Sequence, residues 1–336
     1  MAKRPIDVRR DGAFSMTIGT PEEGEITAMI SLESSMYVVK QRAIYKIISA
    51  DDIDPDRKNI AIPHANQLVA PVGSESILVA RTLMTASALL KSSQLPARID
   101  VKSGVKLYIE LMEMLLAAEQ LRASLVADQE AARKRAHLVK SGAPSLPSAG
   151  NVSNRATSFI QKAEHAMQVL FKTCTLFYAP TDIKNAGPMF DGFVSLMETT
   201  YGADDPQLPY CKAFAEFGRF IRNLRHCVEH PGPSQHIVTA DYTLTTEGTI
   251  AEPSIGIVHA LAPFHHAPLL EFMELTLTEI SLHSECLLAY LCGKVVQEAA
   301  GFPVVVGELP IDQRRDTPNV RYGYMIDIGN GLQRLG

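Results

Sequence analysis

The sequence predicts a mainly α protein, a helical bundle in two domains of which the second carries a small β-hairpin insertion. Apolar residues recur every three or four positions along several long segments without proline, which is the period of a helix that buries one face. Alternation of apolar and polar residues, typical of strands, is confined to about residues 235–260 and 303–328. We therefore expect more than half of the chain to be helical, with strands only in those two regions.

Helices account for most of the N-terminal half in this prediction, after an irregular lead-in over residues 1–24. Two helices are expected over residues 25–50 and 74–91, and a longer one over residues 103–140. In the long helix, apolar residues repeat at alternating spacings of four and three: Leu107, Leu111, Met114, Ala118, Leu121 and Leu125. Such a seam is typical of a coiled coil or of a bundle helix. It can pair with a second copy of the chain or pack inside its own domain.

A short segment rich in serine, glycine and proline, residues 141–152, is the best domain boundary in the chain. It separates an N-terminal helical domain, residues 1–140, from a second helical domain, residues 153–300, and a short β tail follows at residues 301–336. Helices in the second domain are expected at residues 153–178, around Phe190, and at residues 208–229 and 267–300. Two of them are followed, two residues after their last residue, by a proline (Pro180 and Pro231), and a proline ends a helix because it lacks the N–H and clashes with the preceding turn.

The composition argues against a chain that binds nucleic acid or a membrane over a large surface. The net charge is −5, so no overall basic field attracts nucleic acid or an anionic bilayer. Tryptophan is absent and aromatic residues make up 7%, which disfavours a surface of stacked bases. The most apolar stretch, residues 287–292, is too short to span a bilayer. Any contact with nucleic acid must therefore come from a local patch.

The cysteines indicate a reducing compartment. Five are present, widely spaced and without a CxxC pair, which argues against a disulfide framework and against a zinc site. The charged N-terminal segment is followed by no apolar run, so it does not read as a secretory signal. We therefore expect a cytoplasmic protein that needs neither a metal nor a cofactor.

The run from Arg225 to His230, RHCVEH, is the strongest candidate for chemistry. Helical spacing gathers Arg222, Arg225 or His226, and Glu229 away from the apolar stripe, with His230 at the end of the helix. A guanidinium can hold a phosphate and stabilise the charge of a pentacovalent transition state. An imidazole can take a proton from a 2′-hydroxyl or give one to the leaving oxygen. Such a patch can cleave RNA without a metal.

The pattern Arg225-His226-x-x-x-His230 resembles the RX4–6H signature of HEPN domains, in which a polar residue usually follows the arginine. Glu229 matches the glutamate of subfamilies that read Arg-Asn-x-x-Glu-His. The resemblance covers about residues 153–297: a long first helix, the motif near the end of a later helix, a β-hairpin and a closing helix. It implies a metal-independent endoribonuclease that acts as a homodimer on RNA, as a toxin or phage-defence effector, under a protein regulator. Arg225 and His230 would then be catalytic, His226 would orient or polarise, and Arg222 and Glu229 would contact substrate.

A non-catalytic role stays open. Arg225 and Glu229 are four residues apart and can form an ion pair that only stabilises the helix. His230 complements the negative end of the helix dipole, and the same dipole repels a phosphate. The alternative is therefore a helical scaffold that binds a protein or nucleotide partner. In a scaffold His230 would be buried, whereas a ribonuclease needs His230 accessible to solvent and close to Arg225. Three further histidines lack the carboxylate or cysteine partners of a metal site: His259, His265 and His266.

Overall fold

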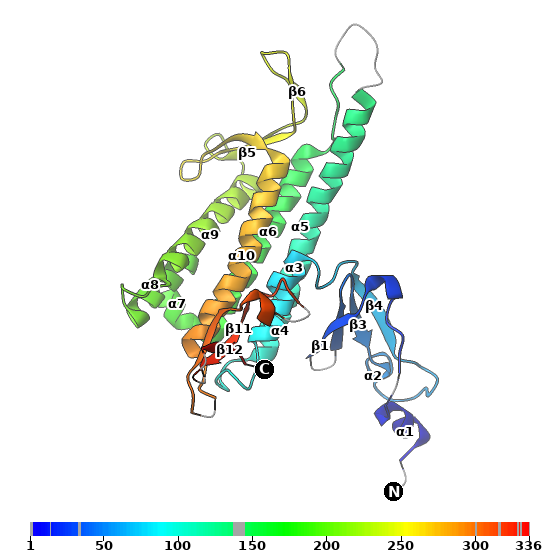
Figure 1. The fold of residues 1–336 in the computed structure, drawn as a ribbon. Coiled ribbons are helices and arrows are strands. Elements are labelled where there is room, and N and C mark those ends of the chain that lie inside the picture. Colours follow the sequence, from blue (N-terminus) through cyan, green and yellow to red (C-terminus); the bar gives the residue numbers. More distant parts are fainter. Residues whose placement is uncertain are drawn as a thin grey trace. The chain divides into compact units, whose positions relative to one another are not determined.

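The computed structural model describes residues 3–13, 15–32, 35–136, 145–299, 301–314, 317–327, 329 and 331–335. The chain divides into two compact units, the first made of residues 1–106 and 292–336 and the second of residues 107–291 (Figure 1). Both boundaries fall inside helices, α5 (Val101–Ala136) and α10 (Leu269–Val295). The predicted boundary at residues 141–152 lies within the second unit instead. Part of it, with the end of the predicted helix at residues 137–140, lies outside the described residues.

The fold class predicted from the sequence is wrong, because the chain has a mixed α/β fold rather than a mainly α one. Helices make up 50% of it and strands 19%. The described residues form four separate sheets. Strands occur in the two regions where they are expected, just beyond each of them at residues 264–268 and 332–334, and also between residues 26 and 70, where the sequence predicts helix and loop.

An antiparallel four-stranded sheet replaces the predicted helix at residues 25–50. Its strands follow one another in chain order: β1 (Ile26–Leu32), β2 (Ser35–Lys40), β3 (Ile44–Ile48) and β4 (Ala65–Ala70). This region is dense in β-branched and aromatic side chains, which pack well on a pleated surface. Val38 pairs with Tyr45 across β2 and β3, and both are buried. Cross-strand packing therefore determines that this segment forms strands, although the spacing of its apolar residues predicts a helix.

Short helices and a second sheet complete the first unit. The elements are α1 (Pro5–Asp11), η1 (Pro21–Glu23), α2 (Ala50–Ile53), α3 (Ile77–Val79), η2 (Ala80–Met84), α4 (Thr85–Leu89), β10 (Val304–Glu308), η3 (Ile311–Gln313), β11 (Tyr322–Asp327) and β12 (Leu332–Arg334). The helical run through α3, η2 and α4 confirms the helix predicted over residues 74–91, and β10 and β11 confirm the strands of the tail. The Tyr324 hydroxyl of β11 donates to the Leu89 carbonyl, so the two ends of the chain meet in one core.

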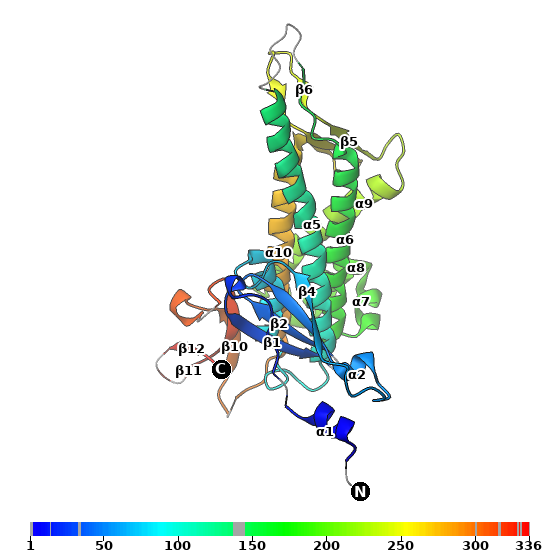
Figure 2. The ribbon, with the colours of Figure 1, turned by 90° about the vertical axis from the view of Figure 1, so that its right-hand side faces the viewer.

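The second unit is a helical bundle. Its long helices α5, α6 (Val152–Phe177), α9 (Leu208–Glu229) and α10 run side by side in both ribbon views (Figures 1 and 2). Two shorter helices, α7 (Pro180–Ala186) and α8 (Met189–Tyr201), follow α6, and α8 packs on α9. Aromatic rings fill the core, for example Phe159 edge-on to Phe272 with ring centroids 6.0 Å apart. The helices predicted for this half of the chain are confirmed.

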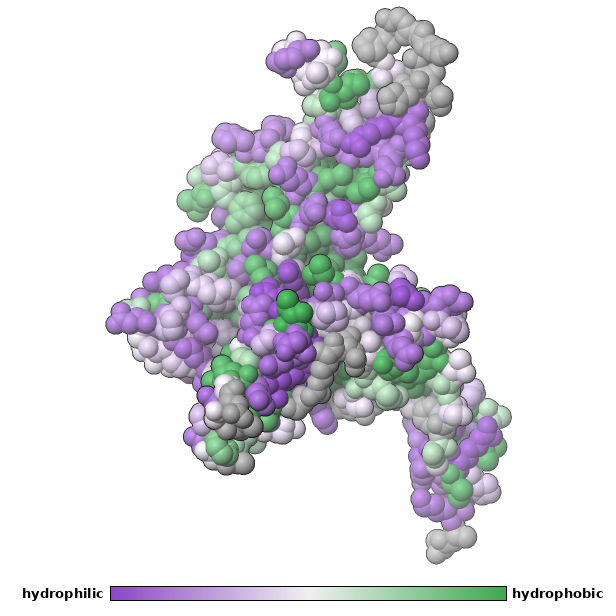
Figure 3. Space-filling model, in the orientation of Figure 1, coloured by the Kyte–Doolittle hydropathy of each residue, from purple (hydrophilic) through white to green (hydrophobic). Residues whose placement is uncertain are grey.

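The apolar seam of α5 packs inside its own unit. Leu111, Ala118 and Leu125 are buried, and the other three seam residues are half-buried. At the start of the seam, the Tyr108 hydroxyl donates to the Ser284 carbonyl of α10 over 2.8 Å. Beyond Leu125 the sequence becomes charged, and hydrophilic side chains cover that end of the helix (Figure 3).

Between α9 and α10 the chain forms a small antiparallel sheet with strand order β5-β8-β9. These strands are β5 (His236–Ala240), β8 (Ser254–Val258) and β9 (Phe264–Pro268), with the hairpin of β6 (Thr243–Leu244) and β7 (Ile250–Ala251) inserted after β5. The hairpin insertion predicted from the sequence is confirmed, and β9 is an additional strand. Strand β5 contacts both α6 and α9, which brings the sheet to the end of α9.

Gly73 tests the packing of the first unit, because it lies against the turn between β2 and β3. A Cβ atom added at Gly73 would lie 2.0 Å from the Lys40 carbonyl oxygen and 2.7 Å from the Ala43 nitrogen. Gly73→Ala must displace this backbone and should lower the free energy of unfolding by about 2–3 kcal/mol in urea unfolding. Gly232→Ala is the control, since its added Cβ meets no described heavy atom within 4 Å. Equal losses in the two variants would contradict the packing described here.

His283 of α10 is a buried imidazole that resists protonation. It is 6% exposed and packs against the rings of Tyr210, Phe214 and Phe217, with centroids 5.7, 5.2 and 5.3 Å away. Burial lowers the pKa of His283 to about 4. The unfolded chain, in which a histidine has a pKa of about 6.5, therefore binds this proton first as the pH falls.

The stabilisation from neutral His283 is present above about pH 6.5 and is lost progressively as the pH falls to about 4, by about 3 kcal/mol in total. His283→Phe, which keeps an aromatic ring in the cluster, should flatten this part of the stability curve. His165→Ala, at an exposed histidine of α6, should leave it unchanged. Urea unfolding at several pH values between 7 and 4 measures the slopes, and identical slopes for His283→Phe and the parent would refute the assignment.

Candidate functional site

The candidate site lies at the C-terminal end of α9. The buried face of the helix includes Phe214, Ile221 and Leu224, which turns Arg222, Arg225 and His226 toward the flanks. The helix ends at Glu229, as the Pro-Gly-Pro sequence predicts, and His230 follows as its C-cap. The structure therefore brings the predicted site residues together on one helix end.

Arg225 is held between two carboxylates. Its Nη1 lies 2.9 Å from Glu164 Oε1 of α6, and its Nε lies 2.8 Å from Glu229 Oε1 one turn along α9. The Glu164 side chain is 7% exposed, so its negative charge is removed from water and needs the guanidinium. Hydrogen bonds to Glu229 and then Glu164 raise the pKa of Arg225 above its usual value. Arg225 is therefore fixed in orientation and ties α9 to α6.

His226 and His230 lie side by side. Their ring centroids are 6.4 Å apart, with the rings at 64° to each other. The backbone positions His230, because its N–H donates to the His226 carbonyl over 2.9 Å and its carbonyl accepts from Gln235 Nε2 over 2.7 Å. His226 is half-buried, whereas His230 is exposed. The exposure of His230 fits the nuclease interpretation better than that of a buried structural histidine.

Surrounding groups favour the neutral form of His226. Burial is the largest cause of its lowered pKa, and the positive fields of Arg222, His230, His259 and Arg225 follow. A neutral imidazole accepts a proton, whereas a protonated one cannot. The environment of His226 thus favours a base near neutral pH.

His259 belongs to the same cluster, which the sequence analysis does not anticipate. The Cys227 thiol of α9 lies 3.7 Å from the Val258 carbonyl at the end of β8, so the residue after Val258 reaches the last turn of the helix. His259 Nδ1 accepts a hydrogen bond from the Leu261 N–H over 3.2 Å, which leaves the ring proton on Nε2. Only the return of a strand to the helix end brings His259 here.

Arg222 and Glu229 differ in their surroundings. Arg222 is exposed and has no ion-pair partner in the described part of the chain, so it can meet an anion from solution. Glu229 is ion-paired with Arg225, so its carboxylate holds the arginine side chain in place, and the prediction that it contacts a substrate stays a prediction. The described residues include no group of three or more His, Cys, Asp or Glu side chains that could hold a metal ion.

None of the five cysteines, all of which lie in the described part of the chain, forms a disulfide, and four of them are buried. Burial raises the pKa of the Cys292 thiol to about 12 and also raises that of Cys174 and Cys227. These thiols therefore stay protonated and offer no nucleophile to the site. Of the helices that the structure describes, none combines the length and the apolar character needed to cross a membrane.

Comparison with known proteins gives no family: no family model, no curated protein and no solved structure matches the chain. The resemblance to HEPN domains therefore stays a prediction that rests on the motif and on the order of the elements. In that order α6 comes first, the motif ends α9, the β5-β8-β9 sheet follows, and α10 closes the bundle.

The two carboxylates paired with Arg225, those of Glu164 and Glu229, should differ in their contribution to stability. Arg225→Ala leaves Glu164 buried without its cation and should lower the free energy of unfolding by about 1–3 kcal/mol. Glu229→Ala removes a partner that is 34% exposed and should cost about 0.5 kcal/mol or less. Adding Glu164→Gln to Arg225→Ala should restore part of the loss. Urea unfolding of the parent and of these three variants measures the losses. Equal losses from Arg225→Ala and Glu229→Ala would show that the Arg225–Glu164 ion pair contributes no more than an exposed ion pair on the helix surface.

Proposed function

We propose that the second unit is a metal-independent endoribonuclease of HEPN type, with its active site at the end of α9. The observation that carries this proposal is the pairing of two imidazoles, His226 and His230, whose ring centroids lie 6.4 Å apart next to the cationic Arg222. Cleavage of RNA at a phosphodiester needs a base, an acid and positive charge at one phosphate. The cluster supplies each of these groups from a single helix end.

The two histidines take different roles because their surroundings differ. His226, with its lowered pKa, is the base that accepts the 2′-hydroxyl proton. His230, which is exposed, donates a proton to the leaving 5′-oxygen. Each transfer needs a nitrogen to oxygen distance of about 2.6–3.2 Å. Two rings 6.4 Å apart can face the two sides of one phosphate at such distances.

The arginines supply positive charge at a helix end whose own dipole is negative. The C-terminal end of α9 carries the negative end of the helix dipole, which repels a phosphate. Arg222 attracts the phosphate past this field, because its own charge has no ion-pair partner among the described residues. Arg225 is held by Glu164 and Glu229, so its remaining guanidinium edge presents fixed donors to the charge that develops in the transition state.

The family resemblance supports the rest of the proposal. It includes a homodimer formed through the end of α9, in which a second motif adds its histidines and arginines to the same substrate. It also includes RNA as substrate, a protein regulator, and a role as a cytoplasmic toxin or phage-defence effector. The free cysteines fit a reducing compartment.

A second function is favoured by one observation. Arg225 is ion-paired with two carboxylates, one of them buried, which suits a structural arginine in a non-catalytic scaffold. In that case the unit binds a protein or nucleotide partner and the histidines cap the helix. The scaffold and the nuclease differ in what His230→Ala changes.

The expected result for the nuclease is loss of cleavage without loss of stability. His230→Ala and His226→Ala should each lower the rate by about 100-fold or more, because each removes a proton-transfer group. His230→Ala should move the free energy of unfolding by about 1 kcal/mol or less. Arg222→Ala should raise KM more than it lowers kcat, because Arg222 attracts the phosphate of the RNA to the site and takes no part in proton transfer. The assay uses purified protein with structured and single-stranded RNA in EDTA, with unfolding curves recorded in parallel.

His165→Ala is the matched control, since it removes an exposed histidine from α6 and should leave cleavage unchanged. Cleavage that survives His230→Ala, or that wild-type protein loses in EDTA, would refute the mechanism. The proposed dimer is measured separately by light scattering at micromolar concentration. If the protein is a monomer and still cleaves RNA, the roles of His226 and His230 stand and the proposed two-fold dimer is refuted.

A further inference from the structure

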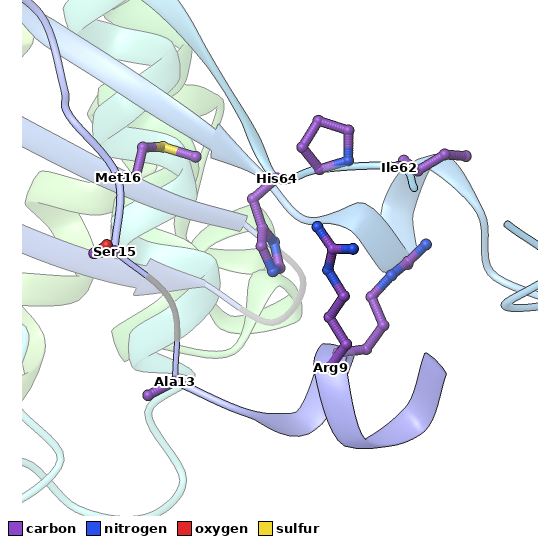
Figure 4. Close-up of a pocket in the computed structure, with 8 residues that line it drawn as sticks. Arg9, Ala13, Ser15, Met16, Ile62 and His64 are labelled. Carbon is purple, nitrogen blue, oxygen red and sulfur yellow. The ribbon is translucent and has the colours of Figure 1, made fainter. Parts of the chain in front are cut away.

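The first unit contains a cavity that the proposed function does not use. It has a volume of about 360 Å³ and lies between α1, the segment that follows α1, and the chain that leads into β4. One wall is basic, formed by Arg9, Arg10 and His64. Apolar side chains also line the cavity: Met16 in the segment that follows α1, and Ile62 and Pro63 in the chain that leads into β4. Figure 4 shows Arg9 and His64 reaching into the same space from separate segments.

An ion-pair network holds α1 against this cavity. Arg10 is anchored to the region of α2, with Nη1 2.8 Å from Asp51 Oδ1 and Nη2 3.3 Å from Asp54 Oδ2. Arg57 returns the contact, since its guanidinium lies 2.9 Å from Asp11 and 2.7 Å from Asp51. The basic wall is therefore part of a cross-linked structure rather than the side of a loose helix.

The charges around α1 are matched except at the cavity. Arg4 pairs with Asp7, and Arg10 and Arg57 pair with the carboxylates of the network. Arg9 is exposed, lines the cavity, and has no ion-pair partner among the described residues. The unmatched positive charge of this cluster therefore lies at the mouth of the cavity.

Arg10 carries a buried N–H group that lacks an acceptor in the described part of the chain. Its side chain is 2% exposed, and its Nε–H is buried without a hydrogen-bond partner among the described residues. A buried donor without an acceptor costs free energy, because water no longer satisfies it. Arg10 lines the cavity, so an acceptor that enters there, with a small adjustment of the side chain, can relieve that cost.

His64 completes the basic wall. The Ala50 N–H donates to His64 Nδ1 over 3.1 Å. A backbone N–H can only donate, so Nδ1 accepts and the ring proton of the neutral imidazole is on Nε2. The wall therefore combines an unmatched guanidinium and a buried arginine N–H with an imidazole ring that the Ala50 N–H holds in place.

We propose that this cavity binds a small organic oxyanion, an apolar or aromatic body that carries a phosphate or a carboxylate. The anionic head meets Arg9, which offers the two parallel N–H donors that suit both oxyanions. The apolar body lies against Met16, Ile62 and Pro63. The volume falls within the range of about 300–1,000 Å³ that is usual for sites of small ligands. This proposal concerns the first unit and does not rest on the nuclease proposal.

Titrations with four probes separate the contributions of the basic and the apolar side chains to binding. Phenyl phosphate and benzoate carry both an anion and an apolar ring, whereas inorganic phosphate carries only the anion and phenol only the ring. We expect at least one of the first two to bind with a Kd of about 1 mM or tighter, and the last two to bind about tenfold more weakly or worse. Proton–nitrogen correlation spectra locate the binding through the Arg10 Nε–H and the Ala50 N–H, which donates to His64.

Two arginine variants assign the charge. Arg9→Met should raise the Kd about tenfold, because a hydrogen-bonded ion pair of this kind is worth about 1.5 kcal/mol or more. Arg4→Met is the matched control in the same helix segment and should leave the Kd unchanged, since Arg4 does not line the cavity. Arg9 is exposed and unpaired among the described residues, so its replacement should leave the fold intact, which an unfolding curve verifies.

Three results would overturn the proposal. The first is the absence of saturable binding by both phenyl phosphate and benzoate. The second is binding of phenol as tight as that of the anions, which would remove the role of the basic wall. The third is an equal loss of affinity in Arg9→Met and Arg4→Met, or spectral changes that leave the Arg10 and Ala50 signals in place, since either would put the anion elsewhere.

Discussion

The arrangement of the candidate site depends on one buried carboxylate. Glu164 of α6 is removed from water, so the fold must bring a cation to it, and Arg225 is that cation. The pair sets the rotation of the last turns of α9, and the rotation decides where His226 and His230 lie. The same helix end receives β8, which adds His259. An interaction that stabilises the bundle thus also determines which imidazoles become neighbours.

The two units use arginine in the same way. In each, a guanidinium locked by carboxylates gives the scaffold its orientation: Arg225 at the end of α9 and Arg10 beside α2. Next to each lies an exposed arginine without an ion-pair partner among the described residues, Arg222 in one unit and Arg9 in the other. The paired arginine has some of its donors engaged by carboxylates and is fixed in orientation, whereas the unpaired one offers its whole guanidinium to an anion. Charge pairing therefore separates structural arginines from candidate binding arginines more clearly than sequence position does.

The sequence predicted local structure well where one signal dominated. Helix α9 ends before Pro231, as expected, because proline and an amphipathic stripe agree there. The segment at residues 26–48 forms strands and not the predicted helix, because cross-strand packing of its β-branched and aromatic side chains outweighs its helical spacing of apolar residues. Neither His259 nor the Arg9 cavity was predicted, since each needs segments far apart in the sequence to meet. Such contacts depend on strand register and on the ion pairs of α1, which no local pattern encodes.

The division of the chain has a consequence for how the protein is made. The second unit is continuous, from residue 107 to residue 291, so all of its partners are present once that stretch has left the ribosome. The first unit also needs residues 292–336, because β11 packs on α4 and Tyr324 bonds to Leu89. Residues 1–106 therefore cannot complete their core until residues 292–336 are synthesised. Until then the face of α4 that packs on β11 is uncovered, and the helical bundle can fold first. During synthesis, the N-terminal part of this chain is the last to be finished.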